Sequence, residues 1–95
     1  SDLYGIMDDI WEMAKLSGAL ETGKNVGSFL GVFRGYPEDL DKMVNRFMKN
    51  EKLSNDKRSQ VIEIYSKLRE EILDIDDKKR RELRDYAQKT KYLFN

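Results

Sequence analysis

The chain has 95 residues, of which 39% are hydrophobic and 38% are charged, and it contains a single proline. This length gives room for one folded domain, and this composition is typical of a folded chain rather than a disordered one. The 18 basic and 18 acidic side chains cancel, so binding to nucleic acid or to an anionic membrane would require a local patch. Cysteine and histidine are both absent, which excludes disulfides, thiol chemistry and the commonest general base.

No apolar run in the sequence approaches the roughly 20 residues of a membrane span, and no secretory leader is recognisable. We therefore expect a cytoplasmic protein with no membrane interaction. Only carboxylates, lysines and hydroxyl groups remain for catalysis. We also expect that the protein is not an enzyme, and that it has no metal, no cofactor and no small-molecule substrate.

Apolar residues recur at three- and four-residue spacing along most of the chain, which is the period of amphipathic helices. The pattern predicts an all-α fold, a compact antiparallel bundle of four or five helices that forms a single domain over residues 1–95. The expected helices cover residues 3–17, 24–34, 37–49, 55–73 and 77–93.

Polar residues and the proline mark where these helices begin. Asp2 is a plausible N-cap of the first helix, and Pro37 fits the first turn of the third. Ser54 or Asn55 can cap the fourth. We interpret residues 74–77 as a break with Asp76 as a new cap, because the apolar stripe is interrupted there. One uninterrupted helix from residue 55 onward is the alternative.

Four of the six glycines stand four residues apart, at Gly23, Gly27, Gly31 and Gly35. A glycine inside a helix costs about 1 kcal/mol relative to alanine, so such a helix needs contacts that only a bare backbone allows. The leading structural interpretation is that Gly27 and Gly31 accommodate large neighbours within the same chain. A second interpretation places the glycines in turns, with no helix at all.

The functional interpretation of this segment is a helix face shaped for a second copy of the chain or for another protein. We expect its contact residues to be Gly27, Phe29, Leu30, Gly31 and Phe33. The glycine series is the one feature of the sequence that lowers helix stability, so it calls for a reason. Non-enzymatic protein interaction is therefore the leading functional prediction, with another protein or a homo-oligomer as the partner.

A basic run near the end of the chain supports an alternative, a nucleic-acid-binding or regulatory function. Its residues are Lys78, Lys79, Arg80, Arg81 and Arg84. Pairs four residues apart, such as Asp77 with Arg81 and Arg81 with Asp85, are expected to neutralise much of this charge. No aromatic side chains that could stack on bases are interleaved with the run, so nucleic-acid binding remains the second choice.

Residues 18–25 match the phosphate-binding pattern G-x-x-x-x-G-K-[ST] at every fixed position except the last. There Asn25 replaces the hydroxyl that would bind magnesium. The segment also follows an amphipathic helix, whereas a phosphate-binding loop of this kind follows a buried strand. We therefore interpret it as the end of a helix followed by a turn, and we do not predict nucleotide binding.

Overall fold

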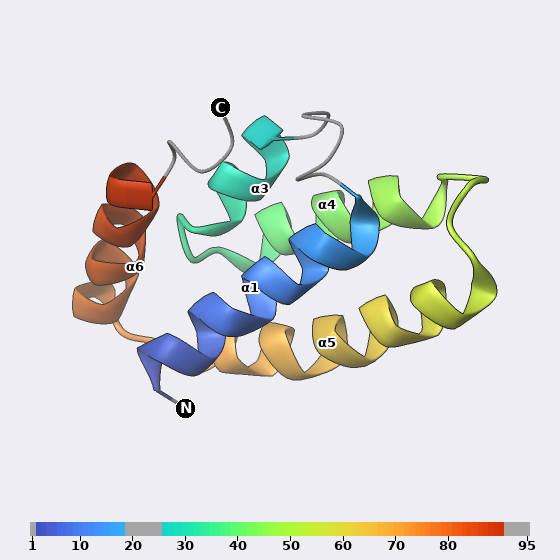
Figure 1. Ribbon diagram of the computed structural model, residues 1–95. Coiled ribbons are helices and arrows are strands. Elements are labelled where there is room, and N and C mark those ends of the chain that lie inside the picture. Colours follow the sequence, from blue (N-terminus) through green and yellow to red (C-terminus); the bar gives the residue numbers. More distant parts are fainter. Residues whose placement is uncertain (1, 19–25, 91–95) are drawn as a thin grey trace.

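The computed structural model describes residues 2–18 and 26–90, with the side chains of residues 26–28 left aside. The predicted all-α bundle is confirmed for this part of the chain, which holds five helices and no strand. These helices are α1 (Leu3–Ser17), α3 (Val26–Val32), α4 (Pro37–Met48), α5 (Asn55–Asp74) and α6 (Asp77–Thr90), shown in Figure 1.

Local capping explains where four of these helices begin. The side chains of Asp2, Ser54 and Asp76 each accept a hydrogen bond from a backbone N–H three residues ahead, in the first turn of α1, α5 and α6. Pro37 occupies the first position of α4. The break between α5 and α6 therefore lies where the sequence predicts it, at residues 75 and 76.

The end of α3 differs from the prediction. This helix ends at Val32 rather than at residue 34, and Phe33 and Arg34 form a turn. The backbone of Gly35 then has φ +83°, a left-handed conformation that glycine adopts without strain. Smaller differences are the ends of α4 and α5, at Met48 and Asp74. The predicted start at residue 24 and end at residue 93 lie outside the described residues.

The described helices share one hydrophobic core. In Figure 1, α4 and α5 form a hairpin joined by a loop at one end of the molecule, α1 crosses α5, and α6 stands at the opposite end. Helix α1 packs on α5, α5 on α4, and α4 on α3. Each of the five helices contributes buried apolar side chains, and Phe33 is contributed by the turn after α3. The largest buried side chains are Phe29, Phe33, Ile6, Ile10, Met13, Leu40, Met43, Leu68, Ile72 and Leu83.

A polar cluster joins α4 to α5. The carboxylate of Asp41 accepts hydrogen bonds from the Tyr65 hydroxyl (2.7 Å) and from Nε and Nη2 of Arg69 (3.0 and 3.3 Å). The hydrogen bond from Arg69 is the main reason that the pKa of Asp41 lies below its ordinary value, although burial opposes this shift. The same carboxylate raises the pKa of Tyr65. Asp41 is therefore held ionised between two donors.

Arg58, in the first turn of α5, organises the loop that leads into this helix. Its guanidinium donates hydrogen bonds to the backbone carbonyl oxygens of Met48, Asn50 and Leu53, the last through Nε at 3.1 Å. Carbonyl groups at the end of a helix lack partners within the helix, so one planar side chain satisfies several of them together. The helical periodicity of the sequence does not reveal this role.

Within residues 2–18 and 26–90, none of the helices combines the length and the apolarity that crossing a bilayer requires. The cytoplasmic location stays a prediction.

Candidate protein-interaction groove

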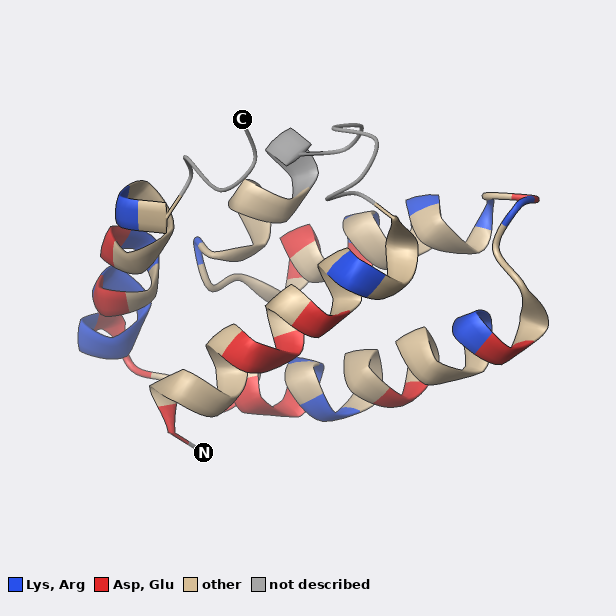
Figure 2. Cartoon of the chain, in the orientation of Figure 1, with Lys and Arg blue, Asp and Glu red and all other residues tan. Residues whose placement is uncertain are grey.

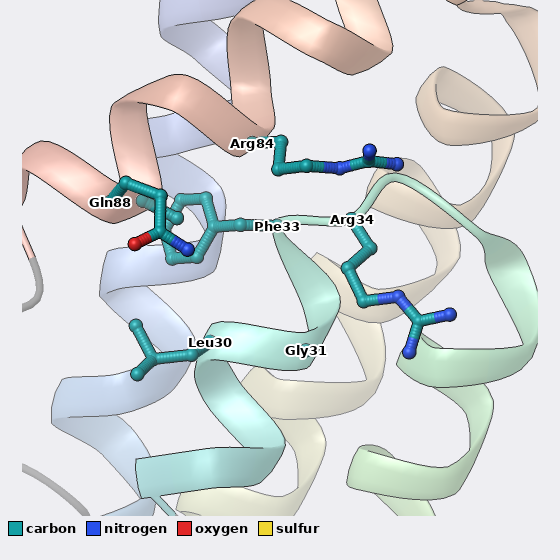
Figure 3. A pocket seen from close by; sticks show the side chains of 7 residues that line it. Leu30, Gly31, Phe33, Arg34, Arg84 and Gln88 are labelled. Atoms are coloured by element: carbon teal, nitrogen blue, oxygen red, sulfur yellow. The ribbon is translucent and has the colours of Figure 1, made fainter.

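A groove of about 330 Å³ lies between the end of α3 and one face of α6 (Figure 3). We refer to it as the α3–α6 groove. It is lined by Leu30, Gly31, Phe33, Arg34, Arg84, Ala87 and Gln88. The structure thus brings together residues that the sequence analysis assigned to two separate sites. Arg84 belonged to the nucleic-acid alternative, and the protein-interaction face included Leu30, Gly31 and Phe33.

Helix α6 contributes three of these residues because of their spacing. Arg84, Ala87 and Gln88 stand three and four positions apart, so they share one face of the helix. Ala87 is buried, whereas Arg84 and Gln88 are exposed. The helix therefore gives the groove an apolar floor and a polar rim.

The floor is held in place by an aromatic cluster. The ring of Phe33 lies between Trp11 of α1 and Tyr86 of α6, with centroid distances of 6.1 and 5.8 Å. Only 1% of Phe33 is exposed. The indole Nε1 of Trp11 also donates a hydrogen bond to the Tyr86 hydroxyl at 3.1 Å. These contacts join the end of α3 to α1 and α6 on the two sides of the groove.

The burial of the two phenylalanines corrects the predicted contact face. Phe29 is fully buried and its ring packs on Phe47 with a centroid distance of 5.3 Å. Phe33 reaches the groove only as part of its floor. Both side chains are core residues because they fill the space between helices, and neither offers an exposed surface to a partner. Leu30 and Gly31 are partly exposed and remain accessible.

The glycines do not form a tight helix contact at the positions where their surroundings are described. A Cβ atom added to Gly31 would meet nothing within 4 Å, so the predicted role of accommodating a large neighbour is wrong there. Gly35 lies in the turn after α3, but the second interpretation, with no helix in this segment, is wrong because Gly27 and Gly31 belong to α3. Gly27 belongs to α3, but its surroundings, like Gly23, lie outside the described part.

Two arginines make the rim of the groove positive. Arg84 is exposed and forms no ion pair with any residue that the structure describes. The Arg34 side chain is 59% exposed, and its Nε lies 3.7 Å from Oδ2 of Asp39, a long contact for an ion pair. Its guanidinium is 5.8 Å from the centre of the Tyr36 ring. A carboxylate that enters the groove therefore meets two cations beside an apolar floor.

The predicted nucleic-acid residues do not all face the solvent. Lys78, Lys79 and Arg81 are exposed, as a phosphate contact requires. The Arg80 side chain, however, is only 19% exposed and turns inward, where Nη1 lies 2.7 Å from the Asp77 carboxylate. Its remaining donors bind the carbonyl oxygens of Gly35 (3.1 Å) and Ile75 (3.4 Å). Arg80 therefore ties α6 to the turn after α3 and is not available to a partner.

The predicted ion pairs along α6 are also corrected. Asp77 pairs with Arg80 instead of Arg81, and no ion pair between Arg81 and Asp85 is formed in the described part of the chain. Glu82 and Asp85 are exposed on the outer side of the helix, close to Lys78 and Lys89 in helical position. The outer face of α6 is thus mixed in charge, and the positive charge next to an apolar surface is found at the groove.

Other chemistry finds little support in the described residues. Across residues 2–18 and 26–90, no three acidic, histidine or cysteine side chains gather closely enough to hold a metal ion. The phosphate-loop-like segment contributes only Gly18, which ends α1 with φ 76°, because residues 19–25 lie outside the described part.

Comparison of the chain with models of protein families, with curated proteins and with solved structures finds no match.

Proposed function

We propose that this protein is an interaction module whose α3–α6 groove binds a short acidic protein segment that carries a bulky apolar side chain. The observation that supports this function is the composition of the groove. Leu30 provides partly exposed apolar surface above a floor of buried Phe33 and Ala87, and Arg34 and Arg84 place two cations next to it. An acidic residue beside a leucine or phenylalanine satisfies both parts of this surface at once.

The two parts contribute differently to binding. Apolar contact supplies most of the affinity, because burial gains about 25 cal/mol for each Å² removed from water. The exposed arginines mainly speed the encounter and select an acidic partner over a basic one, since solvent and salt screen charges at a rim. For a groove of about 330 Å³ we expect weak, reversible binding that decreases with salt concentration.

Nucleic-acid binding is less well supported. The inward Arg80 and the exposed acidic residues Glu82 and Asp85 interrupt the basic surface of α6. A phosphate backbone is a continuous row of negative charges and needs several cations along its path.

Fluorescence anisotropy with two labelled peptides tests the proposal. The first peptide alternates glutamate with leucine, and the second has lysine and serine in their places. We expect only the first to bind, and Arg84→Glu to weaken that binding at least about tenfold through loss of one charge and gain of its opposite. Lys78→Glu is the matched control, because Lys78 stands about 9 Å along α6 and about 120° around it from Arg84.

The control variant should bind the glutamate–leucine peptide as the unmodified protein does. Equal weakening by both variants would show that net charge, and not the groove, controls binding. No binding of the acidic peptide by the unmodified protein would overturn the proposal. Binding of a labelled single-stranded RNA that weakens more with Lys78→Glu than with Arg84→Glu would favour the nucleic-acid function instead.

A further inference from the structure

We infer that the segment bound in the α3–α6 groove is the end of α5 in a second copy of this chain, which inserts the side chain of Leu73. This inference rests on the proposed function and names its partner. Leu73 is 59% exposed, more than any other aliphatic side chain among the large exposed hydrophobic residues of the described part. Among the described residues it is therefore the large aliphatic side chain most accessible to another molecule.

The surroundings of Leu73 are acidic. Together with Glu70, Glu71 and Asp74 it lines a shallow hollow of about 450 Å³. Figure 2 shows acidic residues at this end of α5, whereas acidic and basic residues alternate along α6. Glu70 and Asp74 are exposed, and neither forms an ion pair with a residue that the structure describes. The segment thus presents one exposed leucine with two carboxylates beside it.

This arrangement is complementary to the groove. Glu70 and Asp74 stand four residues apart on α5, so their carboxylates share one face of the helix, and Leu73 lies to one side of both. The groove offers apolar surface for one side chain, with Arg84 at its rim for one carboxylate and Arg34, whose contact with Asp39 is long at 3.7 Å, for the other. Because the whole chain is neutral, with 18 basic and 18 acidic side chains, net charge does not oppose the approach of two copies.

The two surfaces have no residue in common, so each copy carries one donor surface at the end of α5 and one acceptor groove. Contact between different surfaces of identical chains either closes into a ring or continues as a chain. A variant that has lost only its groove can still insert Leu73 into another copy. A variant that has lost only Leu73 can still accept one.

Sedimentation velocity over a concentration series, in low and in high salt, tests this pairing. We expect the unmodified protein to exceed the mass of one chain as concentration rises, and to do so less in high salt. Leu73→Ala and Arg84→Glu should each lower self-association at least about tenfold. Ile62→Ala is the matched control, because Ile62 is exposed on the same helix (43%) but lies away from the acidic hollow, and it should associate normally.

The decisive sample is an equal mixture of Leu73→Ala and Arg84→Glu. Each variant alone should remain monomeric, and the mixture should form a complex of one chain of each. Leu73→Ala supplies the intact groove, and Arg84→Glu supplies the intact Leu73. Far-ultraviolet circular dichroism checks that both variants are folded, which we expect since both side chains are exposed.

Three results would overturn the inference: a strictly monomeric protein at about 1 mM, self-association that neither variant weakens, or a mixture that forms no complex. The peptide experiment separates this failure from that of the proposed function. A monomeric protein that binds the glutamate–leucine peptide through Arg84 keeps the function and excludes the second copy as its partner. A protein that binds no such peptide and remains monomeric would overturn both the proposed function and the inferred partner.

Discussion

The Nε1 of Trp11 donates a hydrogen bond to the hydroxyl of Tyr86 over 3.1 Å, joining side chains that are 75 residues apart in the sequence. Phe33 packs against both rings. This contact attaches α6 to α1, and Arg80 attaches α6 to the turn after α3. The groove between them exists because these three aromatic side chains are packed together, and the same cluster should contribute to global stability.

Replacing Tyr86 with phenylalanine tests that contribution. The variant keeps the ring beside Phe33 but loses the hydroxyl that accepts the hydrogen bond from Trp11. We expect the free energy of unfolding to fall by about 1 kcal/mol, as measured by urea denaturation. Tyr4→Phe is the control, because Tyr4 is 76% exposed, and its stability should not change. Equal stability of both variants would show that the hydrogen bond contributes nothing in water.

Two glycines of the four-residue series should respond in opposite ways to alanine. At Gly35, φ is +83°, and an added Cβ would lie 2.7 Å from Cγ of Arg80 and 3.2 Å from Cδ1 of Ile75. We expect Gly35→Ala to lower the free energy of unfolding by about 1–3 kcal/mol. At Gly31 nothing lies within 4 Å, so alanine should raise it by up to about 1 kcal/mol through its helix propensity. Thermal unfolding of both variants measures this difference, and a destabilised Gly31→Ala would restore the tight-contact interpretation.

The Asp41 cluster predicts how stability depends on pH. The pKa of Asp41 is lower in the folded protein than its ordinary value, chiefly because of the hydrogen bond from Arg69. Such a carboxyl stabilises the fold above its unfolded pKa of about 3.9, and this stabilisation is lost as pH falls through the folded pKa. We therefore expect the free energy of unfolding to fall between about pH 5 and pH 2.

Asp41→Asn removes the titrating group and should make this fall shallower, as measured by urea denaturation across the same pH range. Part of the fall should remain, because the pKa of Asp76 is also lowered, mainly by its hydrogen bond from the backbone N–H of Lys79. An unchanged slope in Asp41→Asn would mean that the cluster does not contribute to acid stability.

Arg58 should be more important for stability than its place at the start of a helix indicates. Replacing it with methionine keeps much of the side-chain length but leaves the carbonyl groups of Met48, Asn50 and Leu53 without their charged donor. We expect a loss of about 1–3 kcal/mol in chemical denaturation. Lys57→Met, one residue earlier on the exposed side of α5, should have little effect. A similar fall in the free energy of unfolding for both variants would show that the loss of one positive charge from α5, and not the loss of the carbonyl contacts, causes the effect.

Much of the fold was predictable because its signals act over a few residues. Asp2, Ser54 and Asp76 bind N–H groups of their own first turns, and Pro37 suits the first position of a helix wherever that helix packs. The end of α3 was placed two residues too late. The apolar pattern continues through Phe33, and periodicity alone does not show that the backbone has already turned.

The groove was only partly predictable. Leu30, Gly31, Phe33 and Arg84 were identified from the sequence, but as members of two separate sites. Arg34, Ala87 and Gln88 were missed. The spacing of Arg84, Ala87 and Gln88 does place them on one helical face, which was the available signal. Nothing in that spacing says that this face meets the end of α3.

Local sequence was sufficient to place most helix ends, because capping and periodicity act between residues three or four positions apart. It assigned the buried Phe29 and Phe33 to a contact face instead of the core. It could not show that Arg80 turns inward to the carbonyl of Gly35 while Arg84 remains at the rim of a groove. Those positions follow from packing between segments that lie 45 to 75 residues apart. Whether a charged or aromatic side chain is buried depends on which helix faces pack together. That packing depends on residues throughout the chain.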